Sequence, residues 1–180
     1  MFKAELTVED ARAGMLKLQP KIERYADLIV RKGVNVEAGQ EVVIQAPVEV
    51  APFVRTLVAR AYAAGAGHVT VIWSDDEITR LTYENVEASW FETVPSWQRE
   101  QLDSLAEGGA CFIFVEGADP EALKGIDPAK PAAASKARNT QCKAYRRGMD
   151  FNINPWCIAG APVVAWARRV YPGVEDEVAV

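Results

Sequence analysis

The stretch Glu41–Trp73, EVVIQAPVEVAPFVRTLVARAYAAGAGHVTVIW, decides the fold because it reads as strand, helix, strand. The first apolar run stops at Pro47, and the last one follows a glycine turn at Gly65. Between them, apolar residues keep helical spacing for over three turns, at Val50, Phe53, Val54, Leu57, Val58, Ala61 and Tyr62. Two strands joined through a helix imply a right-handed crossover and parallel pairing.

The same alternation continues on both sides of this stretch. Toward the N-terminus we expect a short helix over residues 7–16, and a second helix that follows Pro20 and ends at Gly33 in a left-handed conformation. Toward the C-terminus we expect helices capped near Asp75 and at Ser96, a strand over 110–115, a loop-rich segment over 116–131, a helix over 132–147, a strand over 151–159 interrupted at Pro155, and a last helix after Gly160. The pattern predicts an α/β fold: a mainly parallel, doubly wound sheet of about four strands flanked by helices.

Length and composition fit one such domain. The 180 residues are 49% apolar and 25% charged, which is an ordinary globular balance. We expect residues 1–19 to form an N-terminal extension with a short helix and residues 20–172 to form the α/β domain. We expect residues 173–180 to begin a linker to a domain absent from this chain.

Charge and cysteine content indicate which partners are disfavoured and which cellular compartment is expected. The net charge of −5 disfavours nucleic acid, since an acidic surface repels phosphates. The N-terminus lacks the apolar core of a signal peptide, and no run approaches the roughly 18 apolar residues that a membrane span needs. Three cysteines without a CxxC pair indicate a reducing compartment. We therefore expect a cytoplasmic protein with neither a nucleic-acid nor a membrane partner.

Few residues can carry chemistry. His68 is the single histidine, and no HExxH motif or His/Cys cluster is present for zinc. Gly65-Ala-Gly67 precedes a strand, whereas a dinucleotide-binding loop follows one. Five basic residues over 132–147 indicate a solvated helix face, and they are Lys136, Arg138, Lys143, Arg146 and Arg147.

The ends of the predicted strands hold the remaining candidates for a ligand site. Asp75 and Asp76 lie just past a strand end, where parallel sheets usually bind ligands. Two adjacent acids could contribute to a metal or amine site, but such carboxylates more often cap the following helix. Gly160 opens a Gly-Ala-Pro turn between a strand and a helix, whose backbone N–H groups could face an anion or serve structure alone. Both interpretations stay open for these three residues.

Four segments in collinear order resemble the N-terminal domain of the M29 family of metal-dependent aminopeptidases. The first reads YADLIVRKG and continues into VNVEAGQEVVI, within residues 22–44. The others are APFVRTLVARAYAAGAGHVTVIWSDDE over 51–77, CFIFVEGADPEALKGIDPAK over 111–130, and IAGAPVVAWARRVYP over 158–172. None is a diagnostic motif alone, and the resemblance rests on their order.

This resemblance implies an exopeptidase that removes N-terminal residues from peptides, with two divalent metals, typically zinc or cobalt, in the full-length enzyme. The metal ligands belong to a C-terminal catalytic domain, and none of them maps onto this chain. The chain is therefore expected to bind no metal, to have no catalytic residue, and to be inactive alone. In the family such a domain packs beside the catalytic one, usually within a homodimer.

Two further functions remain open beside that of an accessory domain. One is a stand-alone small-molecule-binding module that uses the strand ends near Trp73–Asp76 and Gly160, and the other is a purely structural or oligomerising domain. An accessory domain would expose an apolar surface for its partner. Aromatic residues in and beside irregular segments are the candidates for that interface, namely Trp90, Phe91, Trp97 and Trp156.

Overall fold

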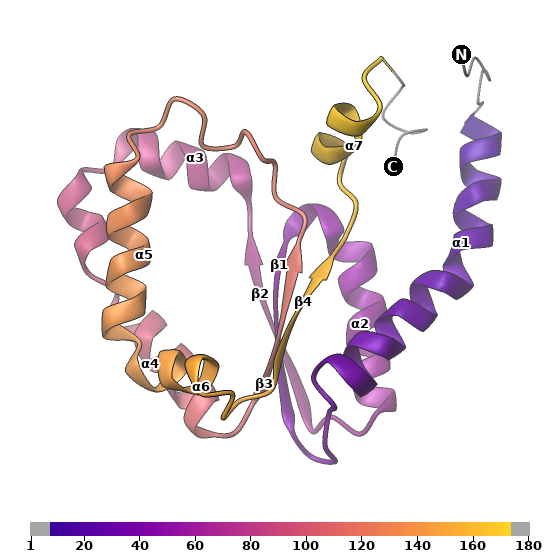
Figure 1. Ribbon diagram of the computed structural model, residues 1–180, viewed down its shortest axis with the longest axis horizontal. Coiled ribbons are helices and arrows are strands. Elements are labelled where there is room, and N and C mark those ends of the chain that lie inside the picture. The colour runs from indigo at the N-terminus through magenta and orange to yellow at the C-terminus, as the bar shows by residue number, and fades with distance from the viewer. Residues whose placement is uncertain (1–7, 174–180) are drawn as a thin grey trace.

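A four-stranded parallel sheet forms the centre of the computed structural model, which describes residues 8–173 (Figure 1). Its strands are β1 (Glu41–Pro47), β2 (His68–Ser74), β3 (Cys111–Glu116) and β4 (Trp156–Gly160), in the order β2-β1-β3-β4. Every neighbouring pair is parallel. The predicted α/β fold with about four parallel strands is confirmed.

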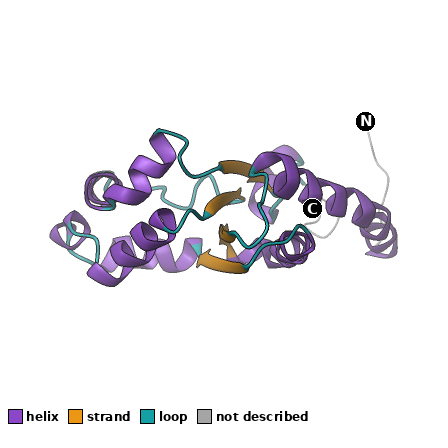
Figure 2. Cartoon of the chain, turned by 90° about the horizontal axis from the view of Figure 1, so that it is seen from below, coloured by secondary structure: helices purple, strands orange, loops and turns teal. Residues whose placement is uncertain are grey.

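Helices cover both faces of the sheet (Figures 1 and 2). The first face, defined here as the one that carries α2, packs against α1 (Val8–Leu28), the π-helical turn η1 (Ile29–Gly33), α2 (Ala51–Ala63) and α7 (Val164–Val170). The second face packs against α4 (Ser96–Glu107), α5 (Ala129–Gln141) and α6 (Lys143–Asp150). On the same side of the sheet, α3 (Asp76–Asn85) and the 3-10 turn η3 (Ala88–Glu92) lie beyond this core (Figure 1). A further 3-10 turn, η2 (Val48–Val50), leads from β1 into α2.

Alternation along the central strands builds the two cores. In β1, Val42 and Ile44 belong to the first-face core, whereas Val43 lies with Phe112 of β3 in the second-face core. Successive side chains of a strand point to opposite faces, so a strand buried on both sides needs a continuous apolar run. The apolar runs of β1 and β3 fit that requirement.

The N-terminal helices differ from the prediction. A single helix, α1, runs from Val8 to Leu28 with Pro20 inside it. The fixed φ of proline is compatible with a helix, although its ring removes one backbone hydrogen bond and crowds the preceding turn. Gly33 does not adopt a positive φ, and the left-handed residue is Asn35 with φ 48°. The absence of a side chain matters at Gly33 for another reason, since a Cβ there would lie 3.0 Å from Cys157 Sγ.

The predicted helix over 132–147 is two helices. The chain leaves α5 at Cys142, whose ψ is 74°, and α6 begins at once. Asp103 of α4 accepts a hydrogen bond from the backbone N–H of Tyr145 at 3.0 Å, so a side chain from a distant helix holds the start of α6. The basic residues assigned to one solvated face are thus divided between α5 and α6.

Strand β4 is shorter than predicted. Helix α6 continues to Asp150, and a turn with Asn152 at φ 50° occupies the residues that were expected to open the strand. Pro155 precedes the strand, and its carbonyl accepts a hydrogen bond from the N–H of Phe112 at 2.9 Å. Ser96 is also not a cap, because Pro95 holds that position and no side chain caps α4.

Candidate functional site

The carboxyl ends of β1 and β3 define the candidate site. After β1 the chain turns to the first face and enters α2, whereas after β3 it crosses to the second face and enters α5 (Figure 1). The direction of winding therefore reverses between these two neighbouring strands. In open parallel sheets, ligands bind beyond the carboxyl ends of the strands at such a reversal.

A cleft of about 360 Å³ lies at this position on the second face. We call it the strand-end cleft. Its floor includes Ile72, Gln45 and Phe114, which lie in register on β2, β1 and β3. Helix α4 contributes Gln98, Gln101 and Leu102, and Arg138 comes from α5. Glu116 lies at the end of β3 and Trp73 near the end of β2.

Gln45 and Arg138 form the polar centre of the strand-end cleft. The guanidinium of Arg138 donates from Nη2 to Oε1 of Gln45 at 3.0 Å, and it also lies 5.4 Å from the centre of the Tyr145 ring. Because the guanidinium only donates, the bond fixes the orientation of the amide. The Nε2 atom of Gln45 is buried, and no acceptor for it exists among the described residues.

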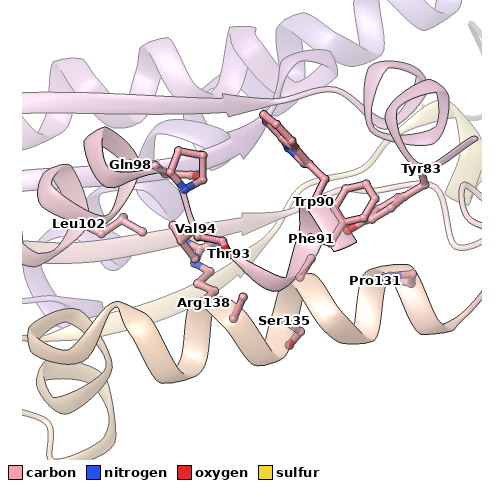
Figure 3. A pocket seen from close by; sticks show the side chains of 13 residues that line it. Tyr83, Trp90, Phe91, Thr93, Val94, Gln98, Leu102, Pro131, Ser135 and Arg138 are labelled. Atoms are coloured by element: carbon pink, nitrogen blue, oxygen red, sulfur yellow. The ribbon is translucent and has the colours of Figure 1, made fainter. Parts of the chain in front are cut away.

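A second cavity of about 450 Å³ adjoins the strand-end cleft and shares Gln98, Leu102 and Arg138 with it. We call it the aromatic cavity, and Figure 3 shows the side chains that line it. Tyr83 and Phe91 place their ring centres 4.8 Å apart in its wall, and Trp90 lines it as well. Burial raises the pKa of the Tyr83 phenol, so this group stays a neutral donor and acceptor.

The carboxylates predicted as ligand candidates both accept backbone hydrogen bonds. Asp75 caps α3 by accepting from the N–H of Ile78 at 2.9 Å, which confirms the expected cap. Asp76 accepts from the N–H of Asp119 at 2.6 Å and so ties the loop after β3 to α3. Neither residue lines the strand-end cleft or the aromatic cavity.

Gly160 lies at the opposite edge of the sheet from these carboxylates. It ends β4, its carbonyl accepts from the Tyr25 hydroxyl at 3.3 Å, and it pairs with Glu116 of β3. Strands β2 and β4 are separated by β1 and β3, so the structure does not bring Asp75 and Asp76 together with Gly160. Trp73, from the same predicted group of strand ends, does line the strand-end cleft.

The sequence prediction missed the polar centre of the cleft. Arg138 was assigned to a solvated helix face, yet it is half-buried and contacts Gln45 across the cleft. The signal in the sequence was Gln45 itself, an amide in the middle of an otherwise apolar strand. A polar side chain at such a position needs a partner, and only the fold shows which residue supplies it.

Metal-binding groups are not assembled in the part of the chain that the structure describes. Among the side chains that the structure describes, no group of three or more from histidine, cysteine, aspartate or glutamate lies close enough to hold a metal ion. His68 lies at the start of β2, with Nδ1 3.2 Å from Glu41 Oε1. These donors do not fit a two-metal centre, which needs several such groups around two ions about 3.5–4 Å apart.

The three cysteines are free thiols within the core or at its edge. Burial raises the pKa of Cys111 to about 12, and it also raises the pKa of Cys142 and Cys157. A thiol that stays protonated is a weak nucleophile and a weak metal ligand. The structure thus gives these residues a packing role.

The aromatic residues predicted as an interface differ in exposure. Trp90 is 65% exposed, Trp97 67% and Trp156 40%, whereas Phe91 is half-buried against Tyr83. Trp90 and Phe91 lie in η3, Trp97 lies at the start of α4, and Trp156 opens β4.

No described helix is both long and apolar enough to cross a bilayer.

This sheet, its two helical layers and the collinear segments define the chain as a member of the thermophilic metalloprotease (M29) family, which it matches over residues 18–180. The expected resemblance to that family is confirmed. The chain is 41% identical to aminopeptidase AmpS of Bacillus subtilis over 160 residues, covering 89% of this chain and 39% of the relative. It is 36% identical to aminopeptidase T of Thermus thermophilus, covering 88% of this chain and 39% of the relative.

A solved structure gives the same result. Wild-type AmpT from Thermus thermophilus superposes with a TM-score of 0.80 and 34% identity, over 90% of this chain and 41% of the other. The chain therefore spans about two fifths of the length of the relatives that it matches.

Proposed function

We propose that this chain is the N-terminal, non-catalytic domain of a metal-dependent aminopeptidase that removes N-terminal residues from peptides. One observation carries the proposal: the similarity covers 89% of this chain but only 39% of aminopeptidase AmpS. A chain of this extent supplies one domain, residues 20–172, and leaves the rest of the enzyme to the remaining sequence. Residues 173–180, of which only Gly173 is described, would begin the linker.

The metals belong to the remaining sequence in this proposal. The family is named for metalloproteases, and two zinc or cobalt ions would polarise the scissile carbonyl and supply a hydroxide. Among the described residues no group of three or more possible ligands is assembled, which supports placing the metals in the remaining sequence. We expect the chain to bind no metal and to cleave no peptide alone.

The partner of this chain is then the catalytic domain, and the complete enzyme acts on peptides in the cytoplasm as a homodimer. The exposed indoles of Trp90, Trp97 and Trp156 supply aromatic surface that a neighbouring domain could cover. Phe91 lies in the same 3-10 turn as Trp90 and contacts Tyr83. Single exposed apolar residues are common on any surface, so the proposal uses the number of exposed tryptophans and not any one of them.

Activity assays test the proposal directly. The 180-residue chain and a longer polypeptide that continues into the catalytic domain are incubated with a dipeptide and added zinc or cobalt. Release of the N-terminal amino acid is expected from the longer polypeptide and not from the 180-residue chain. Metal-dependent cleavage by the purified 180-residue chain would refute the proposal.

The strand-end cleft favours a second candidate function, that of a small-molecule-binding module. It lies where the winding direction of the sheet reverses, and it holds a buried amide donor that no described residue satisfies. This candidate does not exclude the first, because an accessory domain can hold a ligand of its own. Asp75, Asp76 and Gly160 lie outside that cleft, so in this proposal they keep their structural roles.

A further inference from the structure

Strand β4 lies at one edge of the sheet, and among the described residues its outer side has no neighbouring strand. The carbonyl of Pro155 faces β3, since it accepts from the N–H of Phe112. Backbone groups alternate in direction along a strand, so every second residue faces the same way. Trp156 and Ile158 therefore direct their N–H and C=O groups away from the sheet.

These outward backbone groups have no hydrogen-bond partner in the part of the chain that the structure describes. Gly160 is the third residue of the outward row, and its carbonyl accepts from the Tyr25 hydroxyl at 3.3 Å. A row of unbonded groups at a sheet edge favours pairing with another strand. Proteins that keep such an edge free often place lysine, proline or inward-pointing charges on it, and the sequence of β4, WCIAG, contains none of these.

The side chains of the outward residues form an uncovered apolar surface on the second face. Trp156 pairs in register with Phe112 and Ile158 with Phe114, and the Trp156 ring lies 6.3 Å from the Phe114 ring between centres. The second-face core nevertheless includes no residue of β4, and Trp156 is 40% exposed and Ile158 60%. The first face of β4 is covered, because Ala159 belongs to the first-face core.

The remaining sequence of the full-length enzyme is the occupant that can reach this edge most readily. This step rests on the proposed function, in which more than half of the polypeptide follows Val180. Helix α7 comes directly after β4 and packs with the first-face core, so the chain leaves the sheet from this edge strand (Figure 1). A segment tethered in this way acts at an effective concentration on the order of millimolar, whereas a second copy binds only at its free concentration.

We propose that a strand of the catalytic domain pairs with the outer edge of β4 and continues the sheet. Its backbone bonds to the outward N–H and C=O groups of Trp156 and Ile158. Its side chains at alternate positions lie beside these two residues on the second face, so we expect apolar residues there. The two domains would then be joined by strand pairing as well as by the linker.

Hydrogen–deuterium exchange at single amides tests the inference in the 180-residue chain and in a longer polypeptide that includes the catalytic domain. In the 180-residue chain, the amides of Trp156 and Ile158 should exchange fast, whereas those of Cys157 and Ala159, which face β3, should be protected. In the longer polypeptide, exchange at Trp156 and Ile158 should slow by about tenfold or more. Unchanged exchange at both amides would overturn the proposal. Protection in the 180-residue chain that rises with its concentration would also overturn it, because a second copy would then cover the edge.

A charged substitution tests the apolar contribution to the pairing. Ile158→Lys adds a lysine to the edge, and in the longer polypeptide it is expected to remove most of the protection at Trp156. Ile78→Lys is the matched control, since Ile78 is 63% exposed and lies on α3, away from β4, and it should leave the protection unchanged. Full protection at Trp156 in Ile158→Lys would contradict the proposal. Urea unfolding of the 180-residue variants checks the fold, and if Ile158→Lys does not fold, exchange in the two unsubstituted polypeptides decides.

The outcome is distinguishable from that of the proposed function. If the edge is protected in a longer polypeptide that shows no peptidase activity, the proposed function fails while the pairing holds. If the longer polypeptide is active and both amides still exchange fast, only the pairing fails.

Discussion

Leu57 is the side chain through which α2 contributes most to the first-face core. It is fully buried there with Val54 and Ala61, at the spacing that the sequence predicted for the inner side of this helix. Phe53 is only partly buried, and its ring stacks on Tyr25 of α1 at 5.6 Å between centres. Substitutions at Leu57 and Phe53 therefore compare a fully buried and a partly buried position on the same face of α2.

Truncation at Leu57 should cost about 2–5 kcal/mol of unfolding free energy, because the cavity left behind cannot close fully. Phe53→Ala should fall at the lower end of that range, since part of its ring already meets solvent. Urea titration gives both values, and Leu81→Ala on the exposed side of α3 is the control. Losses below about 0.5 kcal/mol at both positions would show that α2 buries another face.

Cys111 gives the protein a pH-dependent stability at the alkaline end. Burial raises its pKa to about 12 from the ordinary value of 9.0, so below pH 9 the thiol is neutral in both states. As the pH rises from 9 toward 12, the unfolded chain releases the proton more readily, and folding stability falls. The urea midpoint should decrease over this range, and by a smaller amount in Cys111→Ala. An equal decrease in both proteins would assign the effect to other groups.

At the scale of elements, most of the helices and strands could be predicted from periodicity, and the exceptions share a cause. The crossover from β1 through α2 to β2 follows from local apolar spacing. The break between α5 and α6 does not, because Asp103 of α4 holds the start of α6 from a distance in sequence. The late start of β4 likewise depends on Asn154, which is buried and donates to the carbonyls of Ala106 and Ala110.

The candidate site was predictable only in part, for the same reason. A strand-end location near Trp73 follows from the topology of parallel sheets, and Trp73 does line the cleft. The partnership of Gln45 with Arg138 joins residues 93 positions apart, and no local pattern indicates it. Capping, by contrast, is local, so the role of Asp75 could be predicted from its position before α3.

The cap of α3 can be measured by substitution. Asp75→Ala should lower the unfolding free energy by about 0.5–2 kcal/mol, because the N–H of Ile78 loses its acceptor at the end of the helix. Asp75→Asn should recover most of this loss, since its amide oxygen can still accept. Thermal unfolding monitored by circular dichroism provides the comparison. If Asp75→Asn loses as much unfolding free energy as Asp75→Ala, the charge of Asp75 is responsible for the effect. If neither variant loses stability, the cap is contradicted.

At the scale of the whole molecule, the solvent exposure of the tryptophan rings shows whether another domain covers the surface. Trp90 and Trp97 are the most exposed of them, whereas Trp166 is half-buried and donates from its indole to the carbonyl of Ala118 at 2.7 Å. A docking catalytic domain would bury some of the exposed rings. The remaining rings would keep the environment that they have in the 180-residue chain.

Fluorine-labelled tryptophan resolves this prediction ring by ring. In the 180-residue chain, the signals of Trp90, Trp97 and Trp156 should shift on exchange from H2O to D2O, as expected of exposed rings. In a polypeptide that includes the catalytic domain, at least the rings at the interface should lose that response, while Trp166 serves as the internal reference. An undiminished response at all three positions would place the interface elsewhere.

The strands leave the ribosome in their order along the chain, which differs from their order in the sheet. β1 lies inside the sheet and emerges first, followed by β2 on one side and then by β3 and β4 on the other. Helices α1 and α2 precede β2 in the chain, so a nascent chain that ends just beyond β2 already contains two of the helices that pack on the first face. Its second face, including Val43 and Ile72, has no cover until α4 is translated. During that interval the apolar second face of β1 and β2 is exposed. We expect chaperones to contact the growing polypeptide at this face.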